Sequence, residues 1–298
     1  MLQYGHMSTA LRKLQTSEFP SSLLQIPEPP ETLYLRGSLP DAELKLLCVV
    51  GSRKFTSYGK EACEKLISGL RGYPVVIVSG LALGIDAIAH QAALSVGLVT
   101  IAVPGSGLHP DYLYPSTNRR LAEKIVEAGG ALLSEFEPKH PTYPSNFPQR
   151  NRIMAGLSHA VLMIEAETRS GTMITGRLAA DYNKELLVVP GNIFSKTSEG
   201  PHLFMKLGAT PITTSKDILE ALHLTPRPPE QGELTLVYED CSSEEKEILE
   251  SLIEPKTKDQ LIEELGRSVS LLNSALSLLE LKGLIREEMG EIRRSTSL

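Results

Sequence analysis

Short apolar runs that alternate with amphipathic stretches are the feature that most constrains this fold. The runs are rich in valine, isoleucine and leucine and barely alternate with polar residues, as strands buried on both faces do. Several of them end in glycine where a helical pattern begins. The runs are LLCVVG, VVIVSG, VTIAVPG, ALLSEF, AVLMIEA and ELLVVPG. This pattern predicts an α/β fold with a doubly wound, mostly parallel sheet, which binds ligands at the carboxyl ends of its strands.

Proline-rich stretches divide the chain into predicted regions. Residues 1–40 are predicted to form an irregular lead segment, and residues 41–222 the sheet domain. The sequence LTPRPPEQGE indicates a linker over residues 223–241. Residues 242–298 contain three amphipathic helical patterns, with Ser243 and Thr257 before acidic helix starts, and then a glycine-centred hairpin. This order is typical of a winged-helix domain.

The charge of the chain is unevenly distributed. The whole sequence carries a net charge of -6. Residues 41–222 hold 18 basic and 17 acidic side chains, whereas residues 242–298 hold eight basic and 12 acidic ones. The long middle region can therefore present a local basic face. The acidic C-terminal region is a poor candidate for binding duplex DNA, because neutralisation of phosphates supplies most such affinity.

Composition narrows the remaining possibilities. No apolar run approaches the ~18 to 20 residues that span a bilayer. Cys48, Cys63 and Cys241 lie far apart without CxxC spacing, which argues against a disulfide framework and a zinc site. No nucleophile with a base partner is visible, and no G-x-G-x-x-G follows the first strand. We therefore expect a cytoplasmic protein that is not an enzyme and has no cofactor or metal.

Two predicted strands end in loops suited to an anion. In VGSRKFTSYG, Gly51 allows close backbone approach, Ser52 offers a hydroxyl, and Arg53 offers a fork of donors matched to phosphate. In VSGLALGIDAIAHQAAL, two glycines again permit close approach, and the following helix start supplies free N–H groups. Asp86 and His90 lie four residues apart in that helix. They fit either a metal site or a capping aspartate bonded to a histidine, and no third ligand is visible.

Two further loops have similar chemistry. The run Arg150–Arg152 falls where a helix is expected to begin after Pro148, and cations at a helix N-terminus favour a compensating anion. Either a phosphate or salt bridges to Glu135 or Glu165 would supply it. Phe147 is placed to stack on a base or to act as a hydrophobic staple. In ETRSGTMITGR, Ser-Gly-Thr opens another helix at a strand end, which is again an anion cradle. The carboxyl ends of parallel strands share one edge, so all four loops are expected to converge.

These motifs resemble the DNA-processing protein A family (DprA, also called Smf). The resemblance covers residues from about 20 to 222, and the winged helix matches as well. One departure is the His109-Pro110 pair before Asp111, where the family commonly continues directly from GxGL to Asp. The matching motifs are YLRG, VVGSRKFTSYG, VSGLALGIDAIAHQAAL, PGSGL with YP following, FPQRNRIMAGLSHAVLMIEA, RSGTMITGRLAADYNKELLVVPG and GPHLFMKLGATPITT.

The resemblance implies an extended Rossmann-like domain that binds and protects single-stranded DNA, forms a homodimer, and helps to load the RecA recombinase during natural transformation and homologous recombination. With no tryptophan and 5% aromatic residues, the chain is expected to bind through phosphates rather than by base stacking. The expected nucleic-acid-binding residues are Gly51, Ser52, Arg53, Ser79, Gly80, Gly84, Phe147, Arg150, Asn151, Arg152, Ser170, Gly171 and Thr172.

Two alternatives stay open. The same architecture resembles nucleoside-monophosphate phosphoribohydrolases with a PGGxGTxxE motif, but TRSGTMITGR lacks both the PGG and the glutamate that follows GT. The other is a structural adaptor that only binds protein. Apolar Leu203, Phe204, Met205 and Ile212 fill either a terminal core cluster or, as the resemblance favours, a homodimer contact.

Overall fold

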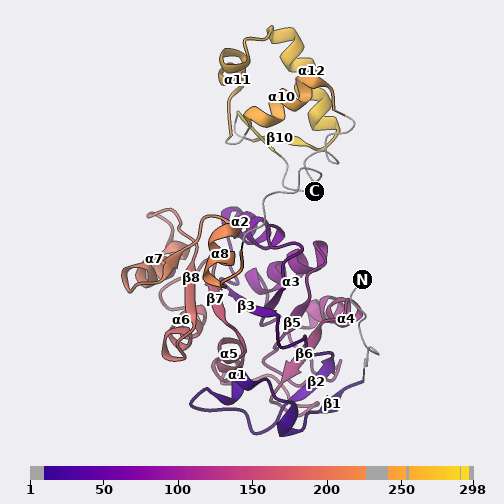
Figure 1. Ribbon diagram of the computed structural model, residues 1–298, viewed down its shortest axis with the longest axis vertical. Coiled ribbons are helices and arrows are strands. Elements are labelled where there is room, and N and C mark those ends of the chain that lie inside the picture. The colour runs from indigo at the N-terminus through magenta and orange to yellow at the C-terminus, as the bar shows by residue number, and fades with distance from the viewer. Residues whose placement is uncertain (1–9, 226–240, 253–254, 289, 295–298) are drawn as a thin grey trace. The chain divides into compact units, whose positions relative to one another are not determined.

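The computed structural model describes residues 10–225, 241–252, 255–288 and 290–294 (Figure 1). It consists of two compact units, Met1–Pro226 and Arg227–Leu298. The division falls within the predicted linker 223–241, of which residues 226–240 lie outside the described residues. In the described ranges, no helix is both long enough and apolar enough to cross a membrane.

The described part of the first unit is built on a nine-stranded sheet with the order β1-β2-β6-β5-β4-β3-β7-β8-β9. Strands β3 to β9 pair in parallel, whereas β1 and β2 are antiparallel additions at one edge. This order confirms the predicted doubly wound, mostly parallel sheet. The strands are β1 Arg12–Lys13, β2 Tyr34–Gly37, β3 Lys45–Val50, β4 Val75–Ser79, β5 Thr100–Ala102, β6 Ala131–Ser134, β7 Ala160–Met163, β8 Glu185–Val188 and β9 Thr210–Pro211.

Helices cover both faces of the sheet. Side chains from α1, α5, α6 and α7 share one apolar cluster with the strands, and those from α2, α3 and α8 share another on the opposite face. Helix α4 packs beside α3. The helices are α1 Ser21–Leu24, α2 Ser57–Ser68, α3 Ile85–Ser95, α4 Arg119–Glu127, α5 Asn146–Leu157, α6 Thr172–Asp181, α7 Glu199–Lys206 and α8 Ser215–Ala221, with short 3-10 turns η1 Thr16–Glu18, η2 Ser116–Asn118 and η3 Lys196–Ser198.

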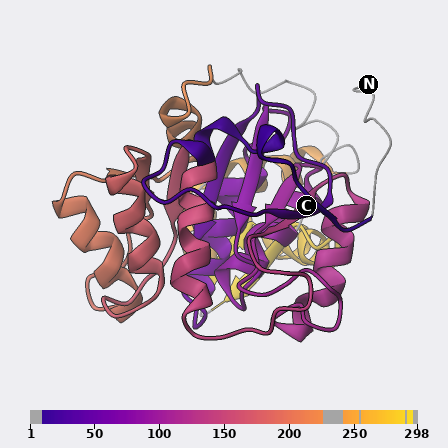
Figure 2. The same ribbon diagram turned by 90° about the horizontal axis from the view of Figure 1, so that it is seen from below.

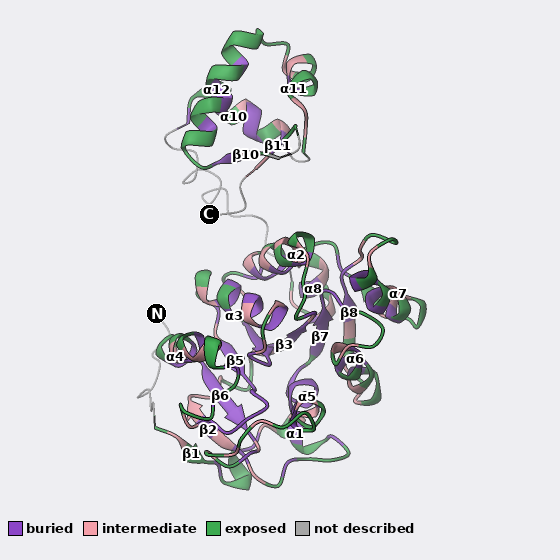
Figure 3. Cartoon of the chain, turned by 180° about the vertical axis from the view of Figure 1, so that it is seen from behind, coloured by how far each residue is buried: buried purple, intermediate pink, exposed green. Residues whose placement is uncertain are grey.

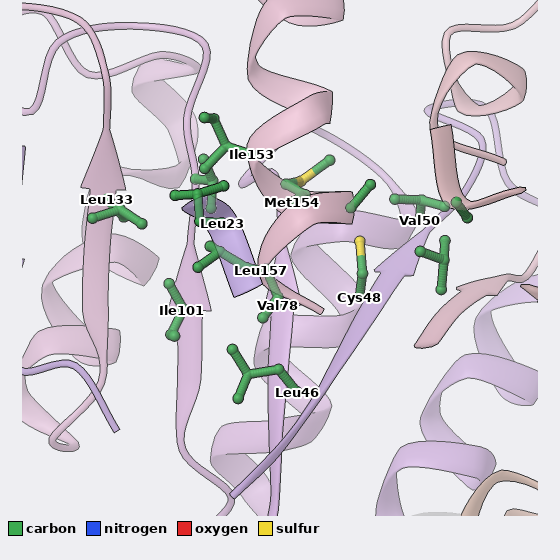
Figure 4. Packing of buried hydrophobic residues seen from close by; sticks show 14 of the residues in the cluster. Leu23, Leu46, Cys48, Val50, Val78, Ile101, Leu133, Ile153, Met154 and Leu157 are labelled. Atoms are coloured by element: carbon green, nitrogen blue, oxygen red, sulfur yellow. The ribbon is translucent and has the colours of Figure 1, made fainter. Parts of the chain in front are cut away.

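Strand β3 shows why the apolar runs are uninterrupted. Its side chains alternate between the two faces, so Cys48 and Val50 enter the cluster under α5 while Leu47 and Val49 enter the opposite one. Figure 4 shows Cys48 and Val50 close to Met154 of α5. The central strands are accordingly among the most buried segments in Figure 3. The five positions after Lys45 are all apolar and buried because both faces of the strand are covered there.

The lead segment is more ordered than we predicted. Residues 1–40 were expected to be irregular, but Tyr34–Gly37 forms β2 and pairs with β6. Arg12–Lys13 forms β1 and pairs in turn with β2. Leu23 of α1 is fully buried in the core. Figure 2 shows this indigo segment running across the unit. Four residues such as YLRG are too short for their own periodicity to identify a strand, so their state depends on the sheet edge that pairs with them.

The predicted dimer residues separate in the structure. Phe204 is 5% exposed and packs its ring against Gly176 of α6, and Ile212 is completely buried. Both therefore belong to the core and cannot form an exposed contact, which corrects that part of the prediction. Met205 is partly buried against the same core, and Leu203 is 40% exposed. A helix places neighbouring residues on different faces, so a contiguous apolar run does not share one environment.

The second unit contains three helices and a hairpin. Its helices are α10 Ser243–Ser251, α11 Lys258–Leu265 and α12 Val269–Leu281, followed by β10 Ile285–Glu288 and β11 Glu291–Arg294. Ser242, rather than the predicted Ser243, caps α10, while Thr257 caps α11 as predicted. Apolar residues from all of these elements form one core. This arrangement agrees with the predicted winged helix.

Candidate functional site

The strand order reverses between β3 and β7, and a cavity of about 530 Å³ lies there. The chain proceeds from β3 outward to β6 and then returns to place β7 on the other side of β3. Loops at the carboxyl ends of such strands diverge and leave a crevice for a ligand. All four predicted loops contribute to the lining, which confirms that they converge. The residues from them are Gly51, Ser52, Arg53, Ala82, Asp86, Phe147, Arg150, Asn151, Ser170, Gly171 and Thr172.

The rim of the cavity holds an exposed cation. The Arg53 guanidinium carbon lies 4.8 Å from the centroid of the Phe147 ring, a cation–π contact that positions the side chain. No carboxylate in the described part of the chain lies within ion-pair distance of Arg53. The Ser52 hydroxyl donates to Lys54 O at 2.8 Å and accepts from Lys54 N at 3.0 Å. Ser52 therefore shapes the loop, and Arg53 supplies its free charge.

The start of α6 presents unpaired donors on the opposite rim. Neither the Gly171 nor the Thr172 N–H group has an acceptor among the described residues. The Ser170 hydroxyl oxygen is buried and also has no described partner. Thr172 instead uses its hydroxyl to donate to Gly51 O at 3.1 Å, which ties α6 to the end of β3. This geometry supports the predicted anion cradle, although the Thr172 side chain is structural.

Arg150 forms the floor of the cavity and differs from Arg53 in its surroundings. It is only 5% exposed, and its guanidinium donates to Gly80 O, Val103 O and Asn151 Oδ1. Burial lowers the pKa of Arg150, and the nearby Asp86 carboxylate acts in the opposite direction. Burial likewise raises the pKa of Asp86, partly offset by Arg150. These two charges stabilise each other inside the protein.

Helix α5 begins at Asn146, earlier than the predicted start after Pro148. The run Arg150–Arg152 therefore lies inside the helix, and its side chains take different directions. Arg152 does not line the cavity; it donates to Glu28 O at 2.5 Å and pairs with Glu135. Arg152 thus makes the salt bridge that the sequence offered as the alternative to a phosphate, and its place on the DNA path stays a prediction. Asn151 lines the cavity and joins α5 to α6 through Gly171 O at 3.4 Å.

The glycines of the first two loops serve close packing within the protein. A Cβ on Gly51 would come within 2.6 Å of the Ile85 side chain. A Cβ on Gly80 would overlap the Arg150 guanidinium, and one on Gly84 would overlap Ser52 O. Gly84 also has φ +82, which L side chains rarely adopt. In the Cβ direction of each glycine, protein groups occupy the space, while Gly51 still lines the cavity; approach of a ligand to these backbones stays a prediction.

Two other predicted residues are structural. Ser79 is fully buried and donates its hydroxyl to Val49 O at 2.7 Å, so it holds β4 against β3 rather than lining the cavity. His90 Nδ1 contacts Thr100 Oγ1 at 2.7 Å, and burial lowers the pKa of His90 to about 3. Asp86 accepts from Ala82 N at 3.4 Å instead of bonding His90. No cluster of metal-ligating side chains occurs among the described residues.

Sequence reasoning missed several residues near the cavity. Lys54 and Glu167 line it, and a signal for Lys54 existed in its position directly after Arg53. Beside it lies a second cavity of about 480 Å³, which shares Pro144 and Phe147 with the first. Its lining includes Tyr112, Tyr114 and Tyr143, from two loops distant in sequence. No local pattern brings these rings together, so only the fold reveals them.

Comparisons with known proteins agree with this architecture. A family model described as DNA recombination-mediator protein A matches residues 11–223, and a model described as the DprA winged helix domain matches residues 226–291. Protein Smf of Escherichia coli is 40% identical over 275 residues, which cover 90% of this chain and 73% of that protein. The DNA processing protein DprA of Streptococcus pneumoniae is 40% identical over 220 residues, covering 72% and 77% respectively.

Solved structures give the same result. The X-ray structure of DprA from Streptococcus pneumoniae superposes with a TM-score of 0.66 at 38% identity, over 70% of this chain and 74% of that one. DNA processing protein A from Helicobacter pylori, whose structure was described for its single-stranded DNA binding mode, gives a TM-score of 0.62 at 31% identity, over 72% and 95%. From its sheet, its winged helix and these matches, the chain belongs to the DNA recombination-mediator protein A family, the DprA/Smf family.

Proposed function

We propose that this protein binds single-stranded DNA through its phosphate backbone at the cavity between β3 and β7. The observation that carries the proposal is the pairing, across one cavity, of the exposed Arg53 cation with the free N–H groups that open α6. Each is a donor suited to a phosphate oxygen. The relative from Helicobacter pylori, described as binding single-stranded DNA, supports the same ligand here.

The wider role follows from the family. A protein that covers the backbone of a single strand protects it and can hand it to a recombinase. We therefore propose that the chain helps to load RecA during natural transformation and homologous recombination, in agreement with the family description of a recombination mediator. RecA filament assembly on DNA precoated with a single-strand-binding protein, measured with and without this chain, tests that step. An unchanged assembly rate would contradict it.

Arg53 provides the direct test of DNA binding. A charge-assisted contact contributes about 1.5 to 3 kcal/mol, so Arg53→Ala should lower the affinity for an oligonucleotide roughly tenfold or more. The cost should be similar for oligo-dT and for mixed sequences, because phosphate carries no sequence information. Arg53→Lys should recover only part of the loss, since an ammonium keeps the charge but not the fork. The slope of log affinity against log salt should decrease by roughly 0.7, the single-strand value for one phosphate.

A matched control is Arg71→Ala, which removes an exposed arginine from the turn before β4, at the opposite edge of the sheet. It should leave both affinity and salt slope unchanged. If Arg53→Ala leaves the slope unchanged and lowers thermal stability instead, Arg53 is a structural residue and the proposal is wrong.

An enzymatic function is the second candidate, because Asp86 places a carboxyl with a raised pKa in the floor of the cavity. A carboxyl group with a raised pKa is the type of group that acts as a general acid when a base is released from a nucleoside monophosphate. We propose that the protein does not catalyse this reaction, since Arg150 holds the Asp86 charge inside the protein. Incubation with each nucleoside monophosphate should release no free base. Turnover abolished by Asp86→Asn would establish the enzyme.

Assembly as a homodimer is also proposed. Leu203 of the predicted set is exposed, and Leu207, at the end of the same helix, is 72% exposed. Together they leave an apolar surface on α7. Leu203→Glu with Leu207→Glu should convert a dimer into a monomer in sedimentation at micromolar concentration. A wild-type chain that sediments only as a monomer would contradict this assignment.

A further inference from the structure

We propose that the bases of the bound strand stack on the three tyrosines Tyr112, Tyr114 and Tyr143, which we call the tyrosine shelf. This inference rests on the proposed function, because it adds a base-binding surface to the phosphate site. The shelf lines the cavity of about 480 Å³ that adjoins the phosphate cavity. The two cavities share Pro144 and Phe147, so a strand held at one continues into the other.

The rings form a connected series that begins at the phosphate site. Arg53 lies over Phe147, and the Phe147 and Tyr114 ring centroids are 6.0 Å apart. Both residues, together with Arg53, also line a small pocket that shares lining residues with each of the two cavities. A phosphate bound at Arg53 therefore has an aromatic surface within one nucleotide of it. Aromatic faces bind every type of base, so such a surface suits a strand of any sequence.

The three tyrosine rings of the shelf are exposed and do not serve to fill the protein core. Tyr112, Tyr114 and Tyr143 are 39%, 44% and 52% exposed, and no hydrogen bond to their hydroxyl groups occurs within the described ranges. Within the described part of the chain, the other exposed residues of this kind, Phe55, Tyr58 and Phe194, do not line this cavity. We expected a chain with so few aromatic residues to lack a stacking surface. The fold nevertheless gathers three exposed rings in one place.

The loops that carry the shelf are held in place before any ligand binds. Tyr112 N donates to His109 O at 2.9 Å, and Tyr114 N donates to Ser106 Oγ at 3.1 Å. On the facing loop, the His140 ring lies 5.7 Å from the Tyr143 ring. The His140 ring also stacks on the Phe136 ring, with the two ring centroids 4.9 Å apart. Rings that are already positioned lose little conformational entropy on binding.

Charges around the shelf favour a strand with unpaired bases. Arg119 lines the cavity and donates to Asp111 O at 2.7 Å, and among the described residues no carboxylate pairs with it. The Asp111 carboxylate oxygen Oδ2 lies 3.6 Å from His109 Nδ1. Arg53 and Arg119 thus offer cations at two places along a path lined by rings. In a duplex the base faces are stacked on one another, so only a single strand can use both kinds of contact.

The test compares oligo-dT with an abasic strand of the same phosphate number. Tyr112→Leu and Tyr143→Leu should each lower oligo-dT affinity by roughly tenfold, from the stacking of one base. Affinity for the abasic strand and the salt slope should not change, which also shows that the variants are folded. Tyr58→Leu is the matched control, because this exposed tyrosine lies on α2 away from the shelf; it should bind both strands like the wild type.

A fluorescence measurement adds an independent readout. The chain has no tryptophan, so Tyr143→Trp places a single indole on the shelf. Oligo-dT should quench its emission through stacking and the abasic strand should not. Equal wild-type affinity for the two strands, together with no effect of the leucine variants, would overturn the shelf while leaving phosphate binding intact. Failure to bind either strand would overturn the proposed function along with it. If the shelf binds a protein partner instead of bases, the two strands should bind with equal affinity and the leucine variants should have no effect.

Discussion

Two arginines of the same cavity have opposite environments. Arg53 on the rim is exposed and has no described carboxylate partner, whereas Arg150 on the floor is buried and donates to three protein oxygens. Both belong to sequence motifs that resemble phosphate-binding loops. The comparison shows that an arginine can line a cavity while its N–H donors are already used by protein oxygens. Free donors, not charge alone, identify the residues available to a ligand.

The same contrast separates the glycines. Gly171 on the rim has open space where a Cβ would stand, whereas a Cβ on Gly80, which packs on Arg150 of the floor, or on Gly84 would overlap its neighbours. The backbone at Gly171 is therefore open to solvent, whereas the backbone at Gly80 and Gly84 is closely packed by other protein groups. Substitutions in the two regions should differ in what they damage: stability for the floor and affinity for the rim.

The largest effect is expected from Arg150→Met. It removes the donor to Gly80 O and Val103 O and, of the two arginine charges that offset the burial of the Asp86 carboxyl, Arg150 and Arg53, the one with the larger effect. Loss of one member of a buried charged pair costs about 3 to 5 kcal/mol of unfolding free energy. Urea unfolding of the full chain, followed for the first unit, measures this. A variant as stable as the wild type would show that Arg150 on the floor contributes no more to stability than Arg53 on the rim.

The next effect compares Gly84→Ala with Gly171→Ala. Alanine at position 84 adopts a positive φ and overlaps Ser52 O, which should reduce the free energy of unfolding by about 1 to 3 kcal/mol. Alanine at position 171 meets nothing within 4 Å and should change stability by less than about 1 kcal/mol. Thermal denaturation of both variants measures the difference. Equal melting temperatures would remove the distinction between floor and rim.

A smaller, pH-dependent effect is expected at His90, beneath the floor. Burial lowers its pKa to about 3, so between about pH 6.5 and pH 3 the unfolded chain binds a proton that the folded chain does not. Stability should therefore fall as pH falls, by roughly 2 kcal/mol between pH 6.5 and 5. In His90→Asn, which keeps a donor to Thr100, this part of the slope should disappear. If the stability of the wild type and that of His90→Asn fall equally with pH, His90 is protonated in the folded state.

The smallest effect is expected from deletion of residues 230–298, which should leave single-strand affinity nearly unchanged. That region is acidic, and α12 of the winged helix carries no lysine or arginine. Titration of a labelled oligonucleotide with the full and truncated chains measures this, with circular dichroism as the control for folding. A large loss of affinity in a folded truncated chain would mean that the rim is not the main binding surface.

Local patterns were sufficient for the sheet and insufficient for the details of its edge. The run LLCVV predicts the buried strand β3 because both faces of that strand are covered. The convergence of four loops also follows, since parallel strands end at the same edge. The start of α5 was placed too late because Pro148 is tolerated in the first turn of a helix, where its missing N–H has no partner to lose.

By itself, the sequence determined the doubly wound sheet, the winged helix and the position of the candidate cavity, because these depend on periodicity and chain order. Only the tertiary structure decided that Arg53 is free while Arg150 and Arg152 are not, and that three tyrosines form a shelf beside Phe147. Those properties depend on partners up to 124 residues away in the chain, such as Glu28 for Arg152. Hydrogen bonding, burial and ring contacts act between neighbours in space, which a local pattern does not specify.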